Sequence, residues 1–204
     1  MDLKLTDIQQ DIRDMAREFA EKEVAPLAEE IDREHRFPAE TFAKMSEMGL
    51  TAITIPEEYG GAGLDDLCKA LAIEEISKKC GATGSILSVH GVPTYIIDKF
   101  ASAEQKAKWL PELAGGKLGA FALTEPGAGS DAGAVLTKAE SDGDHYVING
   151  AKCFITNGIG DYIIVLAKTD PSQGLKGISA IMVEKGTPGF SIARLADKMG
   201  ICAS

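Results

Sequence analysis

Residues 119–133 read GAFALTEPGAGSDAG, and the character of the chain changes on either side of them. The first five residues predict a short apolar strand, which Pro126 ends, and a glycine-rich loop carrying Ser130 and Asp131 follows. Before this stretch the sequence has the periodicity of helices, and after it the alternation of strands. Because ligands often bind where two domains meet, this is the first stretch to test as a binding site.

Upstream of the stretch, the sequence predicts a series of amphipathic helices. Thr6 and Gln9 form a capping box, and apolar residues at three- and four-residue steps continue to Ile31. Pro26 lies inside this pattern and is expected to kink or divide the helix. Further helices are expected over residues 38–49, 65–79, 82–100 and 102–115.

Downstream of the stretch, the sequence predicts short strands separated by turns. These segments are residues 134–138, 145–148, 152–155, 162–167, 178–183 and 190–194. Asp142-Gly143 and Asn149-Gly150 are typical two-residue hairpin signals, so antiparallel pairing is expected. The predicted fold class is α+β, with an amino-terminal α-helical domain over residues 1–117 and an antiparallel β-domain over residues 118–204.

The composition is that of an ordinary globular protein. Of the 204 residues, 45% are hydrophobic and 25% are charged, and the net charge is -10. Such an acidic chain does not favour nucleic acid or an anionic membrane surface as a partner. No apolar run approaches the ~20 residues that span a bilayer, and no secretory signal is expected. The four cysteines lack paired CxxC spacing, which indicates reduced thiols and a cytoplasmic location.

Residues 127–132 match the dinucleotide-binding pattern G-x-G-x-x-G/A, but their context does not. That motif needs a helix to begin at the loop, because the pyrophosphate sits at the helix amino end. Here the following residues, from Val135 to Lys138, predict a strand. A Walker A lysine, an HExxH metal motif and a GxSxG elbow are all missing from the sequence, so we assign no metal site.

Three side chains have both a functional and an ordinary interpretation. Phe154 and Thr156 would lie on one face of a strand, where a flat ring and a hydroxyl suit a planar heteroaromatic cofactor. An aromatic residue and a threonine are also common in sheets that bind nothing. His90, in an apolar helical segment, could act as a base or ligand, or could be a satisfied core residue.

The two glycine-containing segments together resemble the acyl-CoA dehydrogenase family. Residues 123–131 read LTEPGAGSD and residues 146–158 read YVINGAKCFITNG, close to both family signatures at the family's spacing. The resemblance includes PEEYGG at residues 56–61 and spans the whole chain, and it points to bacterial short-chain (butyryl-type) members. It implies an FAD-dependent oxidoreductase of fatty acid metabolism. Such enzymes oxidise an acyl-CoA substrate, pass electrons to an electron-transfer flavoprotein and form homotetramers in their full-length form.

The resemblance also implies roles for particular residues. Thr124 would hydrogen-bond the pyrimidine side of the flavin, Phe154 would pack on its ring and Thr156 would lie near N5. The implied substrate-binding residues are Ser130, Val89 and Tyr95. The full set implied to bind FAD is Phe121, Ala122, Leu123, Thr124, Gly129, Ser130, Phe154, Ile155 and Thr156.

The sequence departs from the family pattern at its carboxyl end. It stops at Ser204, whereas the family continues with more of the β-domain and a helical bundle that carries the catalytic glutamate. We therefore assign no catalytic residue here and expect this chain alone not to oxidise acyl-CoA. Two alternatives stay open: a non-catalytic flavin- or CoA-binding fragment, and a relative resembling acyl-CoA oxidases or nitroalkane-oxidising enzymes.

Overall fold

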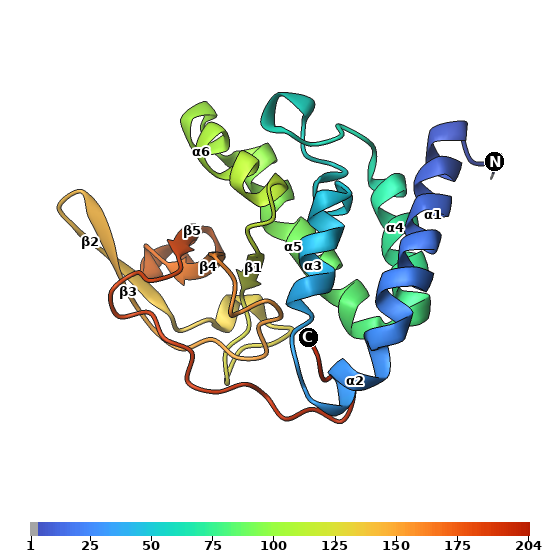
Figure 1. Ribbon diagram of the computed structural model, residues 1–204. Helices are drawn as coiled ribbons and strands as arrows, with labels where there is room; N and C mark the ends of the chain where they lie inside the picture. The colour runs from blue at the N-terminus through green and yellow to red at the C-terminus, as the bar shows by residue number, and fades with distance from the viewer. Residues whose placement is uncertain (1–3) are drawn as a thin grey trace. The chain divides into compact units, whose positions relative to one another are not determined.

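The computed structural model describes residues 4–204 and divides into two compact units (Figure 1). One unit contains the chain up to Leu118 together with Ala196–Ser204, and the other contains Gly119–Leu195. The first unit is helical and the second is built on a β-sheet, so the predicted α+β class, helices first, is confirmed. Within the described residues, no helix combines the length and the apolar character that crossing a membrane requires.

The first helical segment is divided at its proline, as the sequence predicts. In the capping box, Gln9 N donates to Thr6 Oγ1 at 3.3 Å and Thr6 N donates to Gln9 Oε1 at 3.1 Å. A proline inside a helix lacks the N–H and crowds the carbonyl four residues earlier, so the helix loosens before Pro26. The successive elements are α1 (Asp7–Phe19), the π-helical η1 (Ala20–Val24), the 3₁₀ turn η2 (Ala25–Leu27) and α2 (Ala28–Arg33).

Four more α-helices and two 3₁₀ turns complete the helical unit. They are α3 (Ala39–Glu47), η3 (Leu50–Ala52), η4 (Glu57–Tyr59), α4 (Asp66–Lys79), α5 (Gly81–Phe100) and α6 (Ala103–Ala114). α5 packs against α4 and α6 and is largely buried, but one face that includes Ser88 and Tyr95 is exposed. His90 of α5 is fully buried, with its ring edge-on to Phe42 at a centroid distance of 5.4 Å. It is a core residue of this unit.

The second unit contains a mixed five-stranded sheet rather than a purely antiparallel one. Its strands are β1 (Gly119–Ala122), β2 (Lys138–Asp142), β3 (His145–Asn149), β4 (Tyr162–Lys168) and β5 (Ile178–Glu184). β2–β3 and β4–β5 pair antiparallel, but β1 runs parallel to β4, and Lys138 pairs with Lys168 in parallel. Parallel pairing needs a long connection, and the chain between β1 and β4 provides one.

The core of this unit lies where β1 meets β4. Ala120 and Ala122 of β1 and Ile163 and Val165 of β4 are buried together, with partly buried Ile148, Ile155 and Val183 packed against them. Because side chains alternate along a strand, Phe121 points to the opposite face of β1 from Ala120 and Ala122. It is half-buried there.

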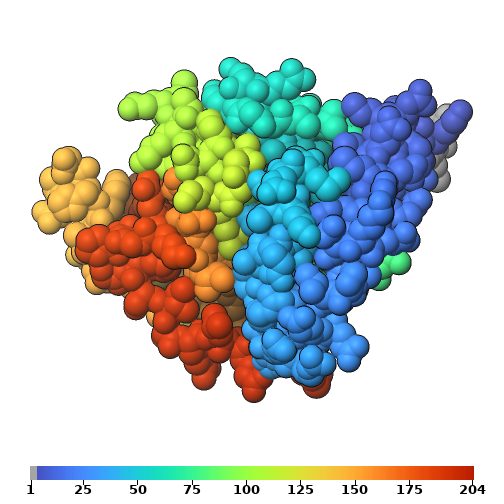
Figure 2. Space-filling model, in the orientation of Figure 1, coloured from blue at the N-terminus to red at the C-terminus, as the bar shows by residue number. Residues whose placement is uncertain are grey.

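The hairpin expected at Asp142-Gly143 is present, and its tip is exposed. Its two turn residues are Gly143 and Asp144, one position later than the signal, because Asp142 pairs with His145. Gly143 has a φ of 67°, a conformation that glycine adopts easily. Figure 2 shows the β2–β3 hairpin as a narrow yellow-orange lobe. The structure thus confirms one of the two hairpin signals.

The hairpin expected at Asn149-Gly150 and three of the expected strands are wrong. Gly150 lies against Thr137, so closely that a Cβ there would be 2.3 Å from Thr137 Oγ1, and residues 150–161 form a loop. Of residues 134–138, only Lys138 is in a strand, because a carboxylate takes the N–H groups of Leu136 and Thr137. Residues 152–155 and 190–194 are also irregular. The positive φ of Phe154 (56°) is incompatible with a strand.

Candidate functional site

The loop that follows β1 closes on itself in a tight turn. Glu125 N donates to Ala128 O at 3.0 Å, and Ala128 N donates to Glu125 O at 3.1 Å. Pro126 lies at the first central position of this turn, where its fixed φ is favourable. The turn brings Ala128 into the interior and leaves Gly127 and Gly129 exposed.

The carboxylate of Glu125 is buried and fully hydrogen-bonded. It accepts from Leu136 N at 2.6 Å, from Thr137 N at 3.0 Å, from Thr137 Oγ1 at 2.5 Å and from Lys152 Nζ at 2.7 Å. Only 6% of Glu125 is exposed. Burial raises the pKa of this carboxyl, but the hydrogen bonds from Lys152, Thr137 and the backbone outweigh burial and hold the pKa at about 2. Glu125 is therefore an ionised structural group at neutral pH.

Lys152 connects this loop to the segment that follows β3. Its Nζ donates to Glu125 Oε1 and also to Leu123 O, the latter at 3.0 Å. The next residue, Cys153, donates its N–H to Thr124 O at 2.9 Å. Residues 123–125 and 152–153 are thus held side by side, although they are far apart in the sequence.

The segment after Lys152 turns an aromatic ring outward. Phe154 is 80% exposed and has a φ of 56°, which is uncommon for a bulky residue and costs conformational energy. Ile155 points the other way and packs on the core of the sheet. Asn157, also left-handed with a φ of 61°, donates its Nδ2 to Gly119 O at 3.1 Å and ties this segment to the start of β1.

The predicted site residues of the β-unit lie in residues 121–130 and 154–156, and the two on α5 belong to the helical unit. Leu123 and Thr124 are half-buried, Ala122 is buried, and Gly129 and Ser130 are exposed. Phe154 and Thr156 share a loop and not the face of a strand, so the expected strand geometry is wrong for them. On α5, Val89 is half-buried and Tyr95 is 48% exposed.

Several donors in the loop after β1 are unused by the protein. Within residues 4–204, the hydroxyls of Thr124 and Ser130 and the N–H groups of Gly129 and Ser130 have no hydrogen-bond partner. Gly127 and Gly129 also lack the usual reasons for glycine: neither has a positive φ, and a Cβ on either would meet open space. A ligand that approached the backbone closely would need glycine at these positions. These residues fit a planar, hydrogen-bonding group such as a flavin.

Glu125 and Lys152 are two residues of this site that the sequence prediction omitted. A signal was present, since each is a charged residue inside an otherwise apolar or glycine-rich motif. Their pairing was not visible, because 27 positions separate them and a contact at that distance depends on the fold. Charged residues are rarely buried unless they are paired, so a buried position for either one would have predicted a partner.

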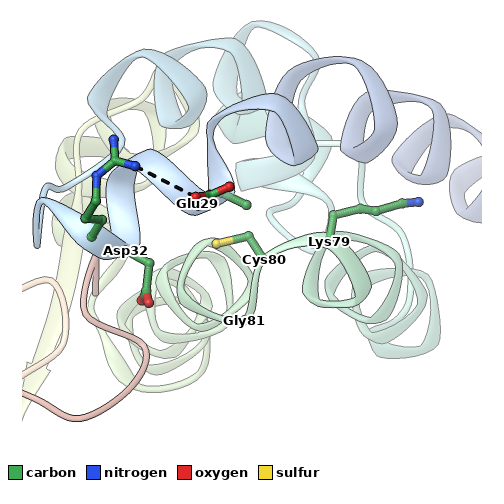
Figure 3. A pocket seen from close by; sticks show the side chains of 7 residues that line it. Glu29, Asp32, Lys79, Cys80 and Gly81 are labelled. Carbon is green, nitrogen blue, oxygen red and sulfur yellow. Dashed lines mark ion pairs between the residues drawn. The ribbon is translucent and has the colours of Figure 1, made fainter.

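A surface depression on the helical unit does not coincide with any predicted site residue (Figure 3). Its volume is about 450 Å³, and it is lined by Ala28, Glu29, Asp32, Arg33, Lys79, Cys80 and Gly81. Its charges already have partners: Arg33 lies 3.8 Å from Glu29, Lys79 lies 3.6 Å from Glu21, and Asp32 accepts the N–H of Cys202 at 2.9 Å. In the described part of the chain, no group of His, Cys, Asp and Glu side chains is arranged to hold a metal ion.

Two family models together match nearly the whole chain. The acyl-CoA dehydrogenase N-terminal domain matches residues 6–117, and the acyl-CoA dehydrogenase middle domain matches residues 120–204. The chain belongs to the acyl-CoA dehydrogenase family.

Two curated relatives are similar over the full length of this chain. The acryloyl-CoA reductase (NADH) of Anaerotignum propionicum is 55% identical over 208 residues, which are 100% of this chain and 53% of that protein. The short-chain specific acyl-CoA dehydrogenase of Clostridium acetobutylicum is 52% identical over 207 residues, covering 100% of this chain and 55% of that protein. The chain therefore spans about half the length of these relatives.

Solved structures agree with the fold. The butyryl-CoA dehydrogenase of Megasphaera elsdenii matches with a TM-score of 0.94 at 42% identity, over 100% of this chain and 55% of that chain. A chain from work on the electron transferring flavoprotein of Acidaminococcus fermentans matches with a TM-score of 0.95 at 49% identity, over 100% and 54%. A glutaryl-CoA dehydrogenase of Mycobacterium smegmatis, solved with FADH2, matches with a TM-score of 0.90 at 32% identity, over 98% and 51%.

Proposed function

We propose that this chain supplies the amino-terminal helical part and the flavin-binding β-part of an FAD-dependent acyl-CoA dehydrogenase for short-chain substrates. The observation that carries the proposal is the exposed ring of Phe154 on a segment that hydrogen-bonds to Thr124, together with the unused donors of Thr124, Gly129 and Ser130. The similarity to a short-chain acyl-CoA dehydrogenase, and to a glutaryl-CoA dehydrogenase solved with FADH2, supports it. When bound, FAD supplies the acceptor for the hydride that leaves the substrate's β-carbon.

The residues of the β-unit hold and orient the flavin in this proposal. Phe121, Leu123 and Thr124 line it, with the Thr124 hydroxyl donating to the ring. The side chain of Ala122 is buried in the core, so only its backbone is available to the flavin. Phe154 packs on the ring face, Ile155 supports it from the core, and Thr156 lies near its reactive edge. Gly129 lets the backbone approach closely.

The predicted substrate-binding residues are Ser130 of the β-unit and Val89 and Tyr95 of α5. The exposed hydroxyl of Ser130 is available to a phosphate of FAD or to the pantetheine arm of CoA, and Val89 and Tyr95 of α5 form part of the acyl pocket. Ordering the thioester against the flavin is the main contribution of these residues to the rate.

The base that removes the α-proton is not assigned to this chain. Among the glutamates of the β-unit, Glu125 lies nearest to the proposed flavin site in sequence, but its oxygens accept four hydrogen bonds in the interior. A carboxylate with a pKa of about 2 is also a weak base. We therefore propose that the catalytic glutamate belongs to a segment outside these 204 residues, which span about half the length of the relatives.

Two assays test the proposal. Titration of the chain with FAD, followed by flavin absorbance and fluorescence, is expected to show saturable binding. Reduction of a redox dye with butyryl-CoA is expected to show no turnover by the FAD-supplemented chain alone. Absence of flavin binding would contradict the cofactor assignment, and clear turnover would place the base within this chain.

A second candidate function is the reverse reaction, reduction of an enoyl-CoA. The 55% identity to an acryloyl-CoA reductase (NADH) favours it, since both directions use the same flavin and thioester geometry. NADH oxidation that depends on acryloyl-CoA, measured with the enzyme that contains this chain, would support the reductase. Its absence, together with butyryl-CoA oxidation, would support the dehydrogenase.

Partners and location form the remaining part of the proposal. Electrons pass to an electron-transfer flavoprotein, the full-length enzyme is a homotetramer, and it acts in cytoplasmic fatty acid metabolism. The flavoprotein context of one solved relative supports the electron partner, and four free cysteines fit a reducing compartment. Reduction of oxygen in place of a flavoprotein would favour the oxidase-like alternative. Flavin or CoA binding without turnover, even alongside the missing segment, would favour a non-catalytic module.

A further inference from the structure

Two charged side chains hold the proposed flavin segments together from the inside. The side chains of Lys152 and Glu125 are 10% and 5% exposed, and their ion pair measures 2.7 Å. Lys152 Nζ donates also to Leu123 O, the carbonyl just before Thr124. The ion pair therefore fixes the position of the backbone next to Thr124.

The same pair anchors the start of the aromatic segment. Lys152 is two residues before Phe154, and Cys153, between them, donates its N–H to Thr124 O at 2.9 Å. The backbone of Phe154 has a positive φ that a bulky side chain adopts only when its surroundings impose it. The hydrogen bonds to Leu123 O and Thr124 O hold the two residues that precede Phe154.

Glu125 connects a third segment to the first two. Its oxygens accept the N–H groups of Leu136 and Thr137 and the hydroxyl of Thr137, in addition to Lys152. Oε1 accepts three of these hydrogen bonds and Oε2 accepts the one from Leu136 N, so the carboxylate is tied to two other segments at once. Charge-assisted hydrogen bonds of this kind are stronger and more directional than neutral ones.

We propose that Glu125 and Lys152 are positioning residues for the flavin, forming a buried clamp that sets the spacing between Thr124 and Phe154. Neither side chain touches the cofactor. The inference rests on the proposed function, because it concerns the geometry of the same flavin site. It adds that affinity for FAD depends on an ion pair that lies behind the binding surface.

Substitutions in the 204-residue chain test the clamp. Lys152→Met is expected to weaken FAD binding at least tenfold, and Lys152→Arg is expected to restore part of the affinity, because a guanidinium can still donate to both acceptors. Lys152→Met leaves a buried carboxylate without its cation and could prevent folding. The double variant Glu125→Gln/Lys152→Met removes both charges, so it tests the clamp in a folded protein.

Hydrogen exchange gives a readout without any ligand. In both Lys152→Met and the double variant, the amide of Cys153 is expected to exchange at least tenfold faster than in the unaltered chain. The amide of Val165, in the middle of β4, is expected to keep its protection. Lys176→Met, at an exposed lysine of the same unit, is the matched control and is expected to change neither exchange nor FAD affinity.

The outcomes separate the clamp from the proposed function. Unchanged FAD affinity in a folded variant, either Lys152→Met or the double variant, would overturn the clamp. A lower melting temperature with unchanged affinity would show that the ion pair has a purely structural role. If the unaltered chain binds no FAD, the proposed cofactor site is wrong for this chain, and only the hydrogen-exchange measurement tests the clamp. Faster exchange at Cys153 alone would then support the clamp, and unchanged exchange would overturn it.

Discussion

At the scale of single residues, the glycines of this chain differ in what they are needed for. A Cβ at Gly150 would lie 2.3 Å from Thr137 Oγ1 and 2.8 Å from its Cα, so the protein itself requires glycine at that position. Gly129 has open space where its Cβ would be and no positive φ, so the protein alone does not require it. A residue that folding does not need, in a loop of unused donors, indicates a function in binding.

Gly129→Ala is therefore expected to leave folding intact and to impair binding. We expect the free energy of unfolding to change by less than about 0.5 kcal/mol or to rise slightly, because alanine restricts the unfolded chain. The Kd for FAD is expected to increase several-fold. Chemical denaturation and FAD titration measure the two effects separately.

Gly150→Ala is the matched control for that experiment. It is expected to lower the free energy of unfolding by about 1–3 kcal/mol, since the new methyl group overlaps the backbone of Thr137. If Gly129→Ala proved equally destabilising, the distinction between a folding glycine and a binding glycine would be wrong.

At the scale of elements, the loop of residues 150–161 replaces the hairpin that Asn149-Gly150 predicts. It leads from β3 to β4 and presents Phe154 on the way. Asn157 holds its far end by two features, a left-handed φ of 61° and a hydrogen bond from Nδ2 to Gly119 O. Asparagine tolerates this conformation better than most residues, so one side chain supplies both features.

Substitutions at Asn157 can separate these two contributions. Asn157→Gly keeps the backbone conformation but loses the hydrogen bond, and we expect a loss of about 1 kcal/mol. Asn157→Ala loses both, and we expect about 2 kcal/mol, since a non-glycine residue in this region costs a further ~1 kcal/mol. Equal losses for the two variants, measured by urea denaturation, would show that the backbone conformation contributes nothing.

At the scale of the whole molecule, a buried ionisable group with a strongly lowered pKa is found in each unit. In the helical unit, burial lowers the pKa of His90 to about 4, against the opposing effect of the Thr51 and Leu113 backbone. In the β-unit, the pKa of Glu125 is about 2, because its hydrogen bonds outweigh its burial. Where the unfolded chain binds the proton of such a group and the folded chain does not, the free energy of unfolding decreases as the pH falls.

The two groups predict an acid transition in two steps. His90 contributes stability that is complete above pH 6.5 and is lost as pH falls toward about 4, roughly 3 kcal/mol in all. The stability from Glu125 is complete above pH 4.5 and is lost as pH falls toward about 2, also about 3 kcal/mol. The helical unit is therefore expected to weaken first.

Trp109 makes this order measurable, because it is the single tryptophan and lies in α6. Its fluorescence is expected to report a loss of stability between pH 6.5 and 4, while β-sheet circular dichroism changes below pH 4.5. His90→Phe is expected to abolish the change in Trp109 fluorescence between pH 6.5 and 4 and to keep the change in circular dichroism below pH 4.5. A Trp109 signal that follows the sheet at every pH would contradict separate control of the two units.

The sequence by itself determined the order of helices before strands, the capping box of Thr6 and Gln9, the division at Pro26 and the family. These features depend on neighbouring residues, on local periodicity or on a contiguous motif, all of which can be read along the chain. Only the tertiary structure decided the parallel pairing of β1 with β4, the loop at residues 150–161 and the outward turn of Phe154. It also decided the burial of Glu125 with Lys152. Those features arise from contacts between distant residues, above all one carboxylate that takes N–H groups a strand would otherwise use.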